Sequence, residues 1–372
     1  MSPSHDQPLD VVVIGAGPAG VGLGLALQAV ESLSFLVLDR GRIGETFRRW
    51  PPALRFLTPS FCGNAFGAPD LNAVHPETSP AFSLGVDYPC GGEYATYLSS
   101  VAAHYRLPVR EHCEVLAISS VDEGFALATG GGTLHARHVV WAGGEFQAPR
   151  RGVDLPGHEH CLHVADGDAW TPGGEAVVIG GFESGIDIAC TLARGGTDVV
   201  VLDPDEPWRQ SASDPSLVLA PRTRGRLREA LATGRVQLHP TSALTIDVDG
   251  DRYLVRAADG TTLPTGRMPI LATGFGPGLG PARPLFDLRE DGWPLLTDDD
   301  ESTRAPGLFL AGPSVRHDDL RLCFVYKFRQ RLAHVAAVIA RRLGRDPQPL
   351  EAWRSAGMLL DDLSCCDAEC AC

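Results

Sequence analysis

Two stretches of the chain share one pattern of apolar and polar positions. Each begins with a short apolar run rich in β-branched residues, at 10–14 and 176–179, and passes through a glycine-rich turn into an Ala/Leu-containing segment. A second apolar run closes each stretch, at 35–38 and 198–202. This order of short strand, helical segment and short strand predicts a β-α-β unit in each stretch. The wide separation of the two units is typical of two nucleotide folds in one chain.

The remaining pattern predicts elements around these two units. Residues 43–90 are rich in proline, glycine and aromatic residues and have little periodicity, and a segment of that length without regular structure is usually functional. The acidic run 298–301 is expected to be a solvated turn. The other expected elements are an amphipathic helix at 92–105, short strands within 107–141, a strand pair at 236–256, buried strands at 268–275 and 307–312, and a last helix at 323–343.

This arrangement predicts an α/β fold with two Rossmann-like, three-layer domains, the second inserted in the first. The first domain is expected to comprise 1–148 and 264–364, and the inserted domain 149–263. Residues 365–372 are expected to form a flexible, cysteine-rich tail.

The first glycine turn has the full spacing of a dinucleotide-binding motif. Gly15, Gly17 and Gly20 directly follow the first strand and open the helix, and Asp39 ends the second strand. In such a turn the first glycine allows the tight bend, the second lets the backbone approach a pyrophosphate, and the third lets helix and strand pack closely. An acid at the position of Asp39 would bind a ribose 2′-hydroxyl. The candidate binding residues here are Gly15, Gly17, Pro18, Ala19, Gly20, Asp39 and Arg40.

The second turn departs from this motif. Gly180 and Gly185 keep the first and third glycines, but Phe182 stands where the second should be and would hinder the approach of a pyrophosphate. Asp203 follows at the position that favours a 2′-hydroxyl, so NADH is slightly favoured over NADPH, although Arg209 nearby keeps NADPH open. The alternative is a retained fold with weak or lost nucleotide affinity.

The chain resembles FAD-dependent pyridine-nucleotide oxidoreductases in several segments. These are GAGPAG at 15–20, ATG at 272–274, GLFLAG at 307–312, and Gly44 to Phe47 with Trp50, which is similar to a G-G-T-W segment beside the flavin. The resemblance is strongest to the bacillithiol-disulfide-reductase-like and flavin-containing-monooxygenase-like branches. It implies FAD in the first domain, NAD(P)H in the inserted one, and further cofactor contacts from Thr46, Trp50, Gly143, Gly274, Gly312 and Pro313.

Three departures from these relatives bear on the reaction. Pro313 stands where many of them carry an Asp after the last glycine. The monooxygenase-like branch also lacks that Asp, so FAD is not excluded. Cys161 takes the place of the histidine in the monooxygenase fingerprint, which weakens the case for oxygen insertion. The chain contains no C-x-x-C sequence, so the dithiol of thioredoxin reductases is missing.

Cys323, at the start of the last helix, is a candidate thiol for disulfide chemistry. In the proteins that this chain resembles, the N-terminus of the last helix points at the flavin, and the helix dipole there would stabilise the reduced flavin. The same dipole, with Lys327 one turn further on, is expected to lower the pKa of Cys323 and favour its thiolate. The alternative is a small buried hydrophobic residue, which is how free cysteines usually pack.

Four of the ten cysteines fall in the last eight residues: Cys365, Cys366, Cys370 and Cys372. No helical or strand period would bury them, and a disulfide between neighbours is strained and easily reduced. They are therefore candidates for a redox relay to an outside acceptor. Two alternatives are capture of a thiophilic metal by four thiolates and a dispensable tail, and no other metal site is expected.

Composition and charge limit the kinds of partner that we expect. A net charge of −14 argues against nucleic acid as a ligand. No apolar run reaches about 18 residues and the first residues lack a secretory pattern, so no membrane partner and a cytoplasmic location are expected. Lys327 is the only lysine among 32 basic residues, which suggests a position where arginine does not serve. A homodimer is left open.

Together these features predict an enzyme, an FAD-dependent oxidoreductase. It would take a hydride from NADH or NADPH and pass electrons through cysteines to a small-molecule or small-protein thiol/disulfide acceptor or to a thiophilic metal. The alternatives are a flavin-dependent monooxygenase and a flavin- and metal-binding protein that is not an enzyme.

Overall fold

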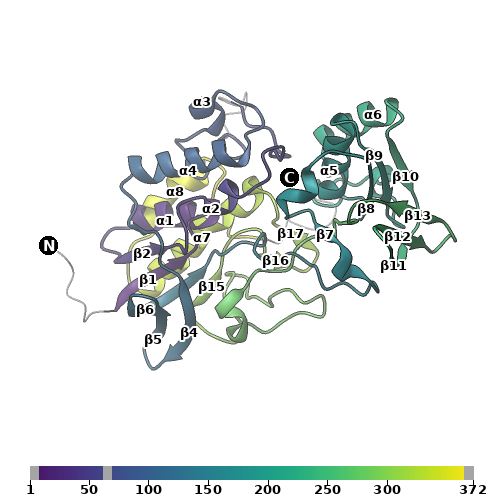
Figure 1. Ribbon diagram of the computed structural model, residues 1–372. Coiled ribbons are helices and arrows are strands. Elements are labelled where there is room, and N and C mark those ends of the chain that lie inside the picture. The colour runs from purple at the N-terminus through teal and green to yellow at the C-terminus, as the bar shows by residue number, and fades with distance from the viewer. Residues whose placement is uncertain (1–7, 62–68, 364–372) are drawn as a thin grey trace.

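The computed structural model describes residues 8–61 and 69–363 of the 372-residue chain. They form two bodies that lie side by side (Figure 1). The N-terminal and C-terminal parts of the chain build one body, and the middle of the chain builds the other. Each body has its own buried apolar core. The four tail cysteines and Cys62 lie outside the described residues.

The first body is organised around a seven-stranded sheet in the order β3-β2-β1-β6-β5-β4, with β15 paired to β6. Its centre is parallel, because β1 pairs in parallel with β2 and β6, and β15 with β6. The apolar runs that the sequence placed at 10–14 and 35–38 are β1 and β2. The strands are β1 (Leu9–Ile14), β2 (Phe35–Leu38), β3 (Val109–Arg110), β4 (Val115–Val121), β5 (Gly124–Thr129), β6 (Gly132–Trp141) and β15 (Leu308–Leu310).

Helices α1 and α7 pack closely against each other in this body. A side chain at Gly22 of α1 would collide with Leu332 of α7, so the glycine allows the close approach. A short hairpin, β16 (Arg316–His317) and β17 (Leu320–Arg321), leads into α7. The helices are α1 (Pro18–Ala29), α2 (Glu45–Arg48), α3 (Pro80–Leu84), α4 (Gly91–His104), α7 (Val325–Arg342) and α8 (Glu351–Ser355).

The second body contains a five-stranded parallel sheet in the order β10-β9-β8-β14-β7. An antiparallel sheet of β11, β12 and β13 is attached to it. The expected strand pair is β11 with β12, whereas β10 joins the parallel sheet. The elements are β7 (Leu162–His163), β8 (Glu175–Ile179), α5 (Glu183–Arg194), β9 (Asp198–Leu202), α6 (Pro221–Ala232), β10 (Val236–His239), β11 (Ala243–Asp249), β12 (Arg252–Ala257), β13 (Thr262–Thr265) and β14 (Ile270–Leu271).

The chain returns to the first body later than the sequence indicated. Strand β14 hydrogen-bonds with β7 and β8, so it belongs to the inserted body, and the expected boundary at residue 264 comes too early. The two connecting segments run side by side, because Pro149 bridges Phe275 and the Arg150 amide donates to the Gly274 carbonyl. The bodies are thus joined by a paired, two-segment connection.

The acidic run 298–301 is not the solvated turn that its composition indicated. Asp300 is completely buried and accepts hydrogen bonds from the Arg331 guanidinium and from His317. Burial alone would raise the pKa of this carboxyl, but the His317 and Arg331 contacts hold it below its usual range. The turn therefore fixes α7 and the β16–β17 hairpin to the body that carries them. No helix of the described ranges is long and apolar enough to cross a membrane.

Candidate functional site

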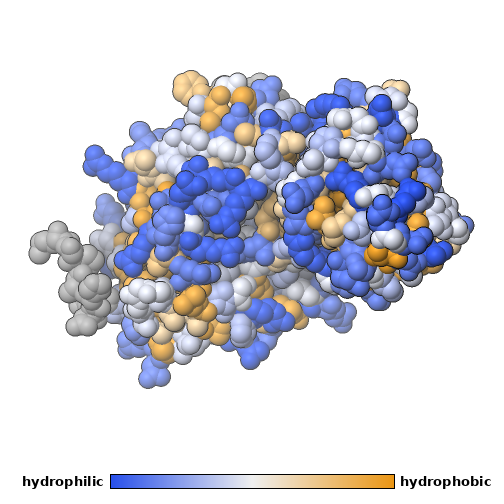
Figure 2. Space-filling view, in the orientation of Figure 1, coloured by the Kyte–Doolittle hydropathy of each residue, from blue (hydrophilic) through white to orange (hydrophobic). Residues whose placement is uncertain are grey.

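A cavity of about 660 Å³ lies between the two bodies and opens where the surface is hollowed (Figure 2). The first glycine turn, α2, the segment after β6 and the start of α7 supply most of its wall. The inserted body supplies the rest, from Val164, Trp170, the start of α5 and Ser216. The cavity therefore joins both nucleotide folds. The predicted site residues that line it are Gly15, Gly17, Pro18, Ala19, Asp39, Arg40, Thr46, Trp50, Gly143, Pro313 and Cys323.

The first turn has the geometry that a dinucleotide needs. Gly15 has a φ of +111°, and a side chain there would collide with the Ala142 carbonyl. At Gly17, the residue before α1, an added Cβ would meet nothing within 4 Å, so the backbone faces open space. Gly20 packs on the Gly15 carbonyl, which is the third glycine's expected role.

Asp39 lies beneath this turn. Its carboxylate accepts hydrogen bonds from the Ala16 amide at 2.7 Å and from the Gly41 amide at 2.7 Å. Burial raises the pKa of the Asp39 carboxyl, although these two bonds act against the rise. Because a carboxylate offers about four acceptor positions, Asp39 can shape the turn and still accept a ribose hydroxyl.

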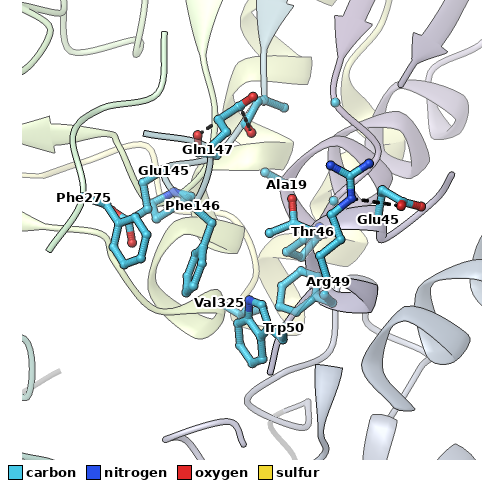
Figure 3. Close-up of a pocket in the computed structure, with 18 of the residues that line it drawn as sticks. Ala19, Glu45, Thr46, Arg49, Trp50, Glu145, Phe146, Gln147, Phe275 and Val325 are labelled. Atoms are coloured by element: carbon cyan, nitrogen blue, oxygen red, sulfur yellow. Dashed lines mark hydrogen bonds and ion pairs between the residues drawn. The ribbon is translucent and has the colours of Figure 1, made fainter. Parts of the chain in front are cut away.

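Helix α2 brings Thr46 and Trp50 to the cavity. The Trp50 ring lies 5.3 Å from that of Phe146, which lies 4.5 Å from that of Phe275. Figure 3 shows Trp50, Phe146 and Phe275 grouped on one side of the cavity, with Ala19 and Thr46 on the other. The Trp50 Nε1 atom is buried and has no acceptor among the described residues. A buried donor without a partner is costly, so a bound ligand would satisfy it.

Cys323 lies where α7 begins, as predicted, but not in the predicted charge state. Phe324 caps the helix without a side-chain hydrogen bond, and Val325, its first residue, lines the cavity. The Cys323 thiol donates to the Ser216 hydroxyl at 3.2 Å. Burial raises the pKa of Cys323, outweighing the Ser216 bond and the Lys327 charge. The expected lowering of this pKa was wrong, because desolvation dominates at this position.

Lys327 is largely buried and joins the two bodies. Its ammonium donates to Asp214 Oδ1 at 2.5 Å, to Ser216 Oγ at 2.7 Å and to the Arg321 carbonyl at 3.3 Å. Three oxygens around one point charge suit a lysine better than the planar fork of an arginine. Burial raises the pKa of Asp214, but the Lys327 and Ser216 contacts outweigh it and hold that pKa below its usual range. Because Asp214 neutralises the Lys327 ammonium, Lys327 does little to lower the pKa of Cys323.

The second glycine turn has the same backbone form as the first, but a phenylalanine stands at the position of Gly17. Gly180 has a φ of +103°, Gly185 packs on the Gly180 carbonyl, and Asp203 accepts from the Gly181 amide at 2.6 Å. Phe182 takes the place of the open Gly17 and lines the main cavity. A second cavity of about 630 Å³, lined by Phe182, Asp203, Asp205 and Ser216 among others, lies on its other side. Phe182 and Ser216 therefore stand between the two spaces.

Five predicted cofactor glycines serve packing or turns instead of lining the main cavity, and one of them is Gly180, which forms the second turn. Gly20 and Gly185 pack their helices on the turns, and Gly312 lies against Ala19. Gly274 accepts a hydrogen bond from Arg150 in the paired connection. The tail cysteines lie outside the described residues. Within 8–61 and 69–363, no cluster of three or more His, Cys, Asp or Glu residues is placed to hold a metal ion.

Two residues of the cavity wall with polar side chains, Glu145 and Ser216, were not predicted as site residues from the sequence. Glu145 follows the glycine pair after β6, the parallel neighbour of β1. Ligands of such sheets bind at the carboxyl ends of the strands, so that rule could have identified Glu145. Ser216 lies in a long loop after β9 and carries no local signal.

These features fit a flavin dinucleotide. The open Gly17 backbone suits a pyrophosphate, the free carboxylate positions of Asp39 suit a ribose, and the unpaired Trp50 N–H and the uncapped α7 suit polar ring atoms. A family model described as pyridine nucleotide-disulphide oxidoreductase matches residues 12–312. The chain belongs to this family. Membership implies FAD and NAD(P)H as cofactors.

Individual relatives support the same fold. An uncharacterized oxidoreductase CzcO-like of Geobacillus kaustophilus is 29% identical over 194 residues, 50% of this chain and 52% of that protein. The chain thus spans about half the length of this curated relative. Bacillithiol disulfide reductase Bdr from Staphylococcus aureus aligns with a TM-score of 0.70 at 17% identity, covering 90% of this chain and 99% of that one. A flavin-containing monooxygenase from Stenotrophomonas maltophilia aligns with a TM-score of 0.67 at 19% identity, covering 91% and 99%. The predicted two-domain dinucleotide fold is confirmed.

Proposed function

We propose that this protein is an FAD-dependent NAD(P)H oxidoreductase that reduces the disulfide of a small thiol through Cys323. The observation that carries the proposal is the shared cavity. Its wall contains the dinucleotide-binding turn at Gly15 and Gly17, and also Cys323 at the start of α7. A thiol placed beside a flavin site is positioned to exchange two electrons with an acceptor disulfide.

The first turn and α7 would hold the FAD. Gly17 would receive the pyrophosphate, Asp39 a ribose hydroxyl, and Trp50 Nε1 a polar atom of the cofactor. The uncapped N-terminus of α7, an 18-residue helix, would favour negative charge on the ring system. When bound, FAD accepts a hydride from the nicotinamide and passes on two electrons.

The second cavity is the proposed nucleotide entrance. Asp203 and Asp205 both line it and would repel the 2′-phosphate of NADP, so NADH is the favoured donor. Phe182 separates this cavity from the flavin site, so its ring must move before the nicotinamide meets the flavin.

Cys323 is the proposed point of contact with the acceptor. The cysteines of the described residues are free, and two of them line the cavity. Cys113 lies at the Asp39 end and Cys323 lies beside Ser216. Ser216 holds the thiol in one orientation, and Lys327 fixes Ser216. The name of the Staphylococcus aureus relative points to a disulfide of bacillithiol, so a low-molecular-weight disulfide is the proposed substrate class.

The tail cysteines are proposed to carry electrons onward from Cys323. The Leu360 amide donates to the Gln330 carbonyl on α7, so the described chain ends beside the helix that begins near Cys323. Five extended residues span about 17 Å, and five helical residues rise about 7.5 Å. Chain length therefore allows Cys365 to reach the mouth of the cavity. Capture of a thiophilic metal by the tail is the alternative role.

The test is an anaerobic rapid-mixing experiment on the full chain. The protein is reduced with NADH or NADPH and then mixed with a low-molecular-weight disulfide, for the wild type, Cys323→Ser and a variant with the four tail cysteines changed to serine. We expect wild-type flavin to be reduced faster by NADH and reoxidised by the disulfide, and Cys323→Ser to be reduced but not reoxidised. Reoxidation at the wild-type rate in Cys323→Ser contradicts the proposal. In a parallel sample the reduced protein is mixed with oxygen instead of a disulfide, and reoxidation by oxygen alone, coupled to hydroxylation of a substrate, supports the monooxygenase alternative.

A further inference from the structure

Glu145 is a carboxyl group in the cavity wall that has no part in the function proposed above. It follows Gly143 and Gly144 at the end of β6 and is half-buried. Figure 3 shows it beside Phe146 and Phe275, on the opposite side of the cavity from Glu45. Among the residues that the structure describes, its side chain has no hydrogen-bond or ion-pair partner, whereas its backbone carbonyl accepts from the Ala148 amide. A half-buried carboxyl that lines a cavity and has no partner is a candidate for a chemical role.

The other carboxyl groups of the cavity are already engaged or lie elsewhere. Asp39 accepts from two backbone amides, and Glu45 pairs with Arg42 and Arg49. Glu114 is exposed and lies at the Asp39 end, where the neighbouring Cys113 amide donates to the Asp39 carbonyl.

The carboxyl groups contributed by the inserted body are engaged as well. Glu183 accepts from Thr223 and from the Ala220 amide, and Asp187 pairs with Arg226. Glu145 is therefore the carboxyl of the cavity wall that is half-buried and has no side-chain partner among the described residues, so it is free to exchange a proton.

The reaction needs such a group. Reduction of a disulfide by NAD(P)H yields two thiols and consumes one proton beyond the hydride. When a Cys323 thiolate attacks one sulfur of the acceptor, the other sulfur departs as a thiolate and must be protonated. An ordinary thiol has a pKa of about 8.5, so an acid that titrates near neutrality can supply this proton.

We propose that Glu145 is the general acid that protonates the departing thiolate of the acceptor disulfide. The inference rests on the function proposed above. Cys323 is a thiol at rest and first loses its proton to solvent. The S–S bond of the acceptor then breaks, a new S–S bond forms between Cys323 and one acceptor sulfur, and the proton of Glu145 passes to the other. A reduced FAD, when bound, would supply the two electrons and the proton that open the mixed disulfide, which would return Cys323 as a thiolate and release the second acceptor thiol. Glu145 regains its proton from solvent.

Electrostatics agree with this role. Burial raises the pKa of Glu145 to about 7, although the Arg316 and Arg150 cations act to lower it. Arg316 is itself held over the Trp293 ring at 3.4 Å. Glu145 lies near enough to Cys323 that its charge raises the pKa of the thiol. These cations and Cys323 are the charged and titratable groups that act on Glu145 from the elements around it.

The test compares wild type, Glu145→Gln, Glu145→Asp and a matched control, Glu290→Gln, whose glutamate is exposed and outside the cavity. Flavin reduction by NADH and reoxidation by a low-molecular-weight disulfide are measured separately between pH 5 and pH 9. General acids contribute about 10²- to 10⁴-fold. We expect Glu145→Gln to slow reoxidation about 100-fold, far more than it slows reduction, and Glu145→Asp to restore part of the rate.

The pH profile separates a chemical role from a structural one. The step needs a Cys323 thiolate and a protonated Glu145 together. Because the pKa of Cys323 is raised, wild-type reoxidation is expected to increase with pH until Glu145 loses its proton at about 7, and then to level off. Glu145→Gln should lose this inflection and Glu290→Gln should keep it. A Glu145→Gln protein with the wild-type rate and profile overturns the inference while leaving the proposed function intact. A wild type whose reduced flavin is not reoxidised by any disulfide overturns both.

Discussion

The two glycine turns of this protein share a backbone and differ in one side chain. Gly17 and Phe182 precede their helices with nearly the same conformation, φ −78° and ψ −170° against φ −84° and ψ −162°. In both turns the first glycine has a positive φ, and an acid accepts from the next amide, Asp39 in one and Asp203 in the other. Neither position needs glycine for its backbone, because both conformations are open to any residue.

The difference therefore concerns the ligand and not the fold. Gly17 leaves open space where a pyrophosphate can approach, whereas Phe182 fills the equivalent space with a ring that borders two cavities. In the function proposed above, the first turn would hold the flavin tightly and the second would admit the nicotinamide during turnover.

The largest effect should come from making the first turn like the second. Gly17→Phe is expected to weaken FAD binding about 100-fold or more, because the ring displaces the pyrophosphate from charged hydrogen bonds worth about 1.5–3 kcal/mol each. The ratio of flavin to protein after dialysis, from visible absorbance, measures this loss. Gly92→Phe is the control, since an added Cβ at Gly92 also meets nothing within 4 Å. Equal flavin content in the two variants would contradict the assignment of the first turn.

The second-largest effect should come from breaking the ion pair of Lys327 and Asp214, which joins the two bodies. Lys327→Met leaves Asp214 without its buried partner, and breaking such a pair costs about 3 kcal/mol. Denaturant unfolding of the cofactor-free protein measures this loss. The surface pair of Arg256 and Asp247 provides the control, because Arg256→Met should cost less than about 1 kcal/mol. Similar costs at the two sites would show that Lys327 does not join the bodies.

A smaller effect is expected from making the second turn like the first. Phe182→Gly opens the nucleotide path and should tighten NADH binding about tenfold, or roughly 1.4 kcal/mol. Titration of the protein with NADH under anaerobic conditions gives the affinity. Phe82→Gly removes an aromatic ring that is 81% exposed and outside the cavity, so it should leave NADH binding unchanged. Weaker NADH binding in Phe182→Gly would mean that the ring holds the nucleotide and does not block it.

Sequence reasoning succeeded where a local pattern carries the geometry. The strand, the spacing of Gly15 and Gly17, and Asp39 define the first turn without reference to the rest of the chain. Cys323 was placed correctly at the start of the last helix for the same reason. Its charge state was not, because the pKa depends on burial under Ser216, which comes from a loop more than 100 residues earlier.

Other features depend on contacts that no local pattern reveals. The acidic run predicted that Asp300 is solvated. In the structure Asp300 is buried and hydrogen-bonds with Arg331 of α7 and with His317. The boundary near residue 264 was set too early because β14 is only two residues long. Only its pairing with β7 and β8 shows that it belongs to the sheet of the inserted body.

The central claim is that Cys323 receives the acceptor sulfur, and one trapping measurement tests it most directly. A variant with the four tail cysteines changed to serine is reduced with NADH without oxygen, mixed with a low-molecular-weight disulfide and quenched with acid. Trypsin then releases peptide 322–327 for mass spectrometry. The account predicts a mixed disulfide on Cys323 that forms before the flavin is reoxidised and disappears as turnover proceeds. Complete reoxidation by the disulfide with no adduct on Cys323 at any time would contradict it.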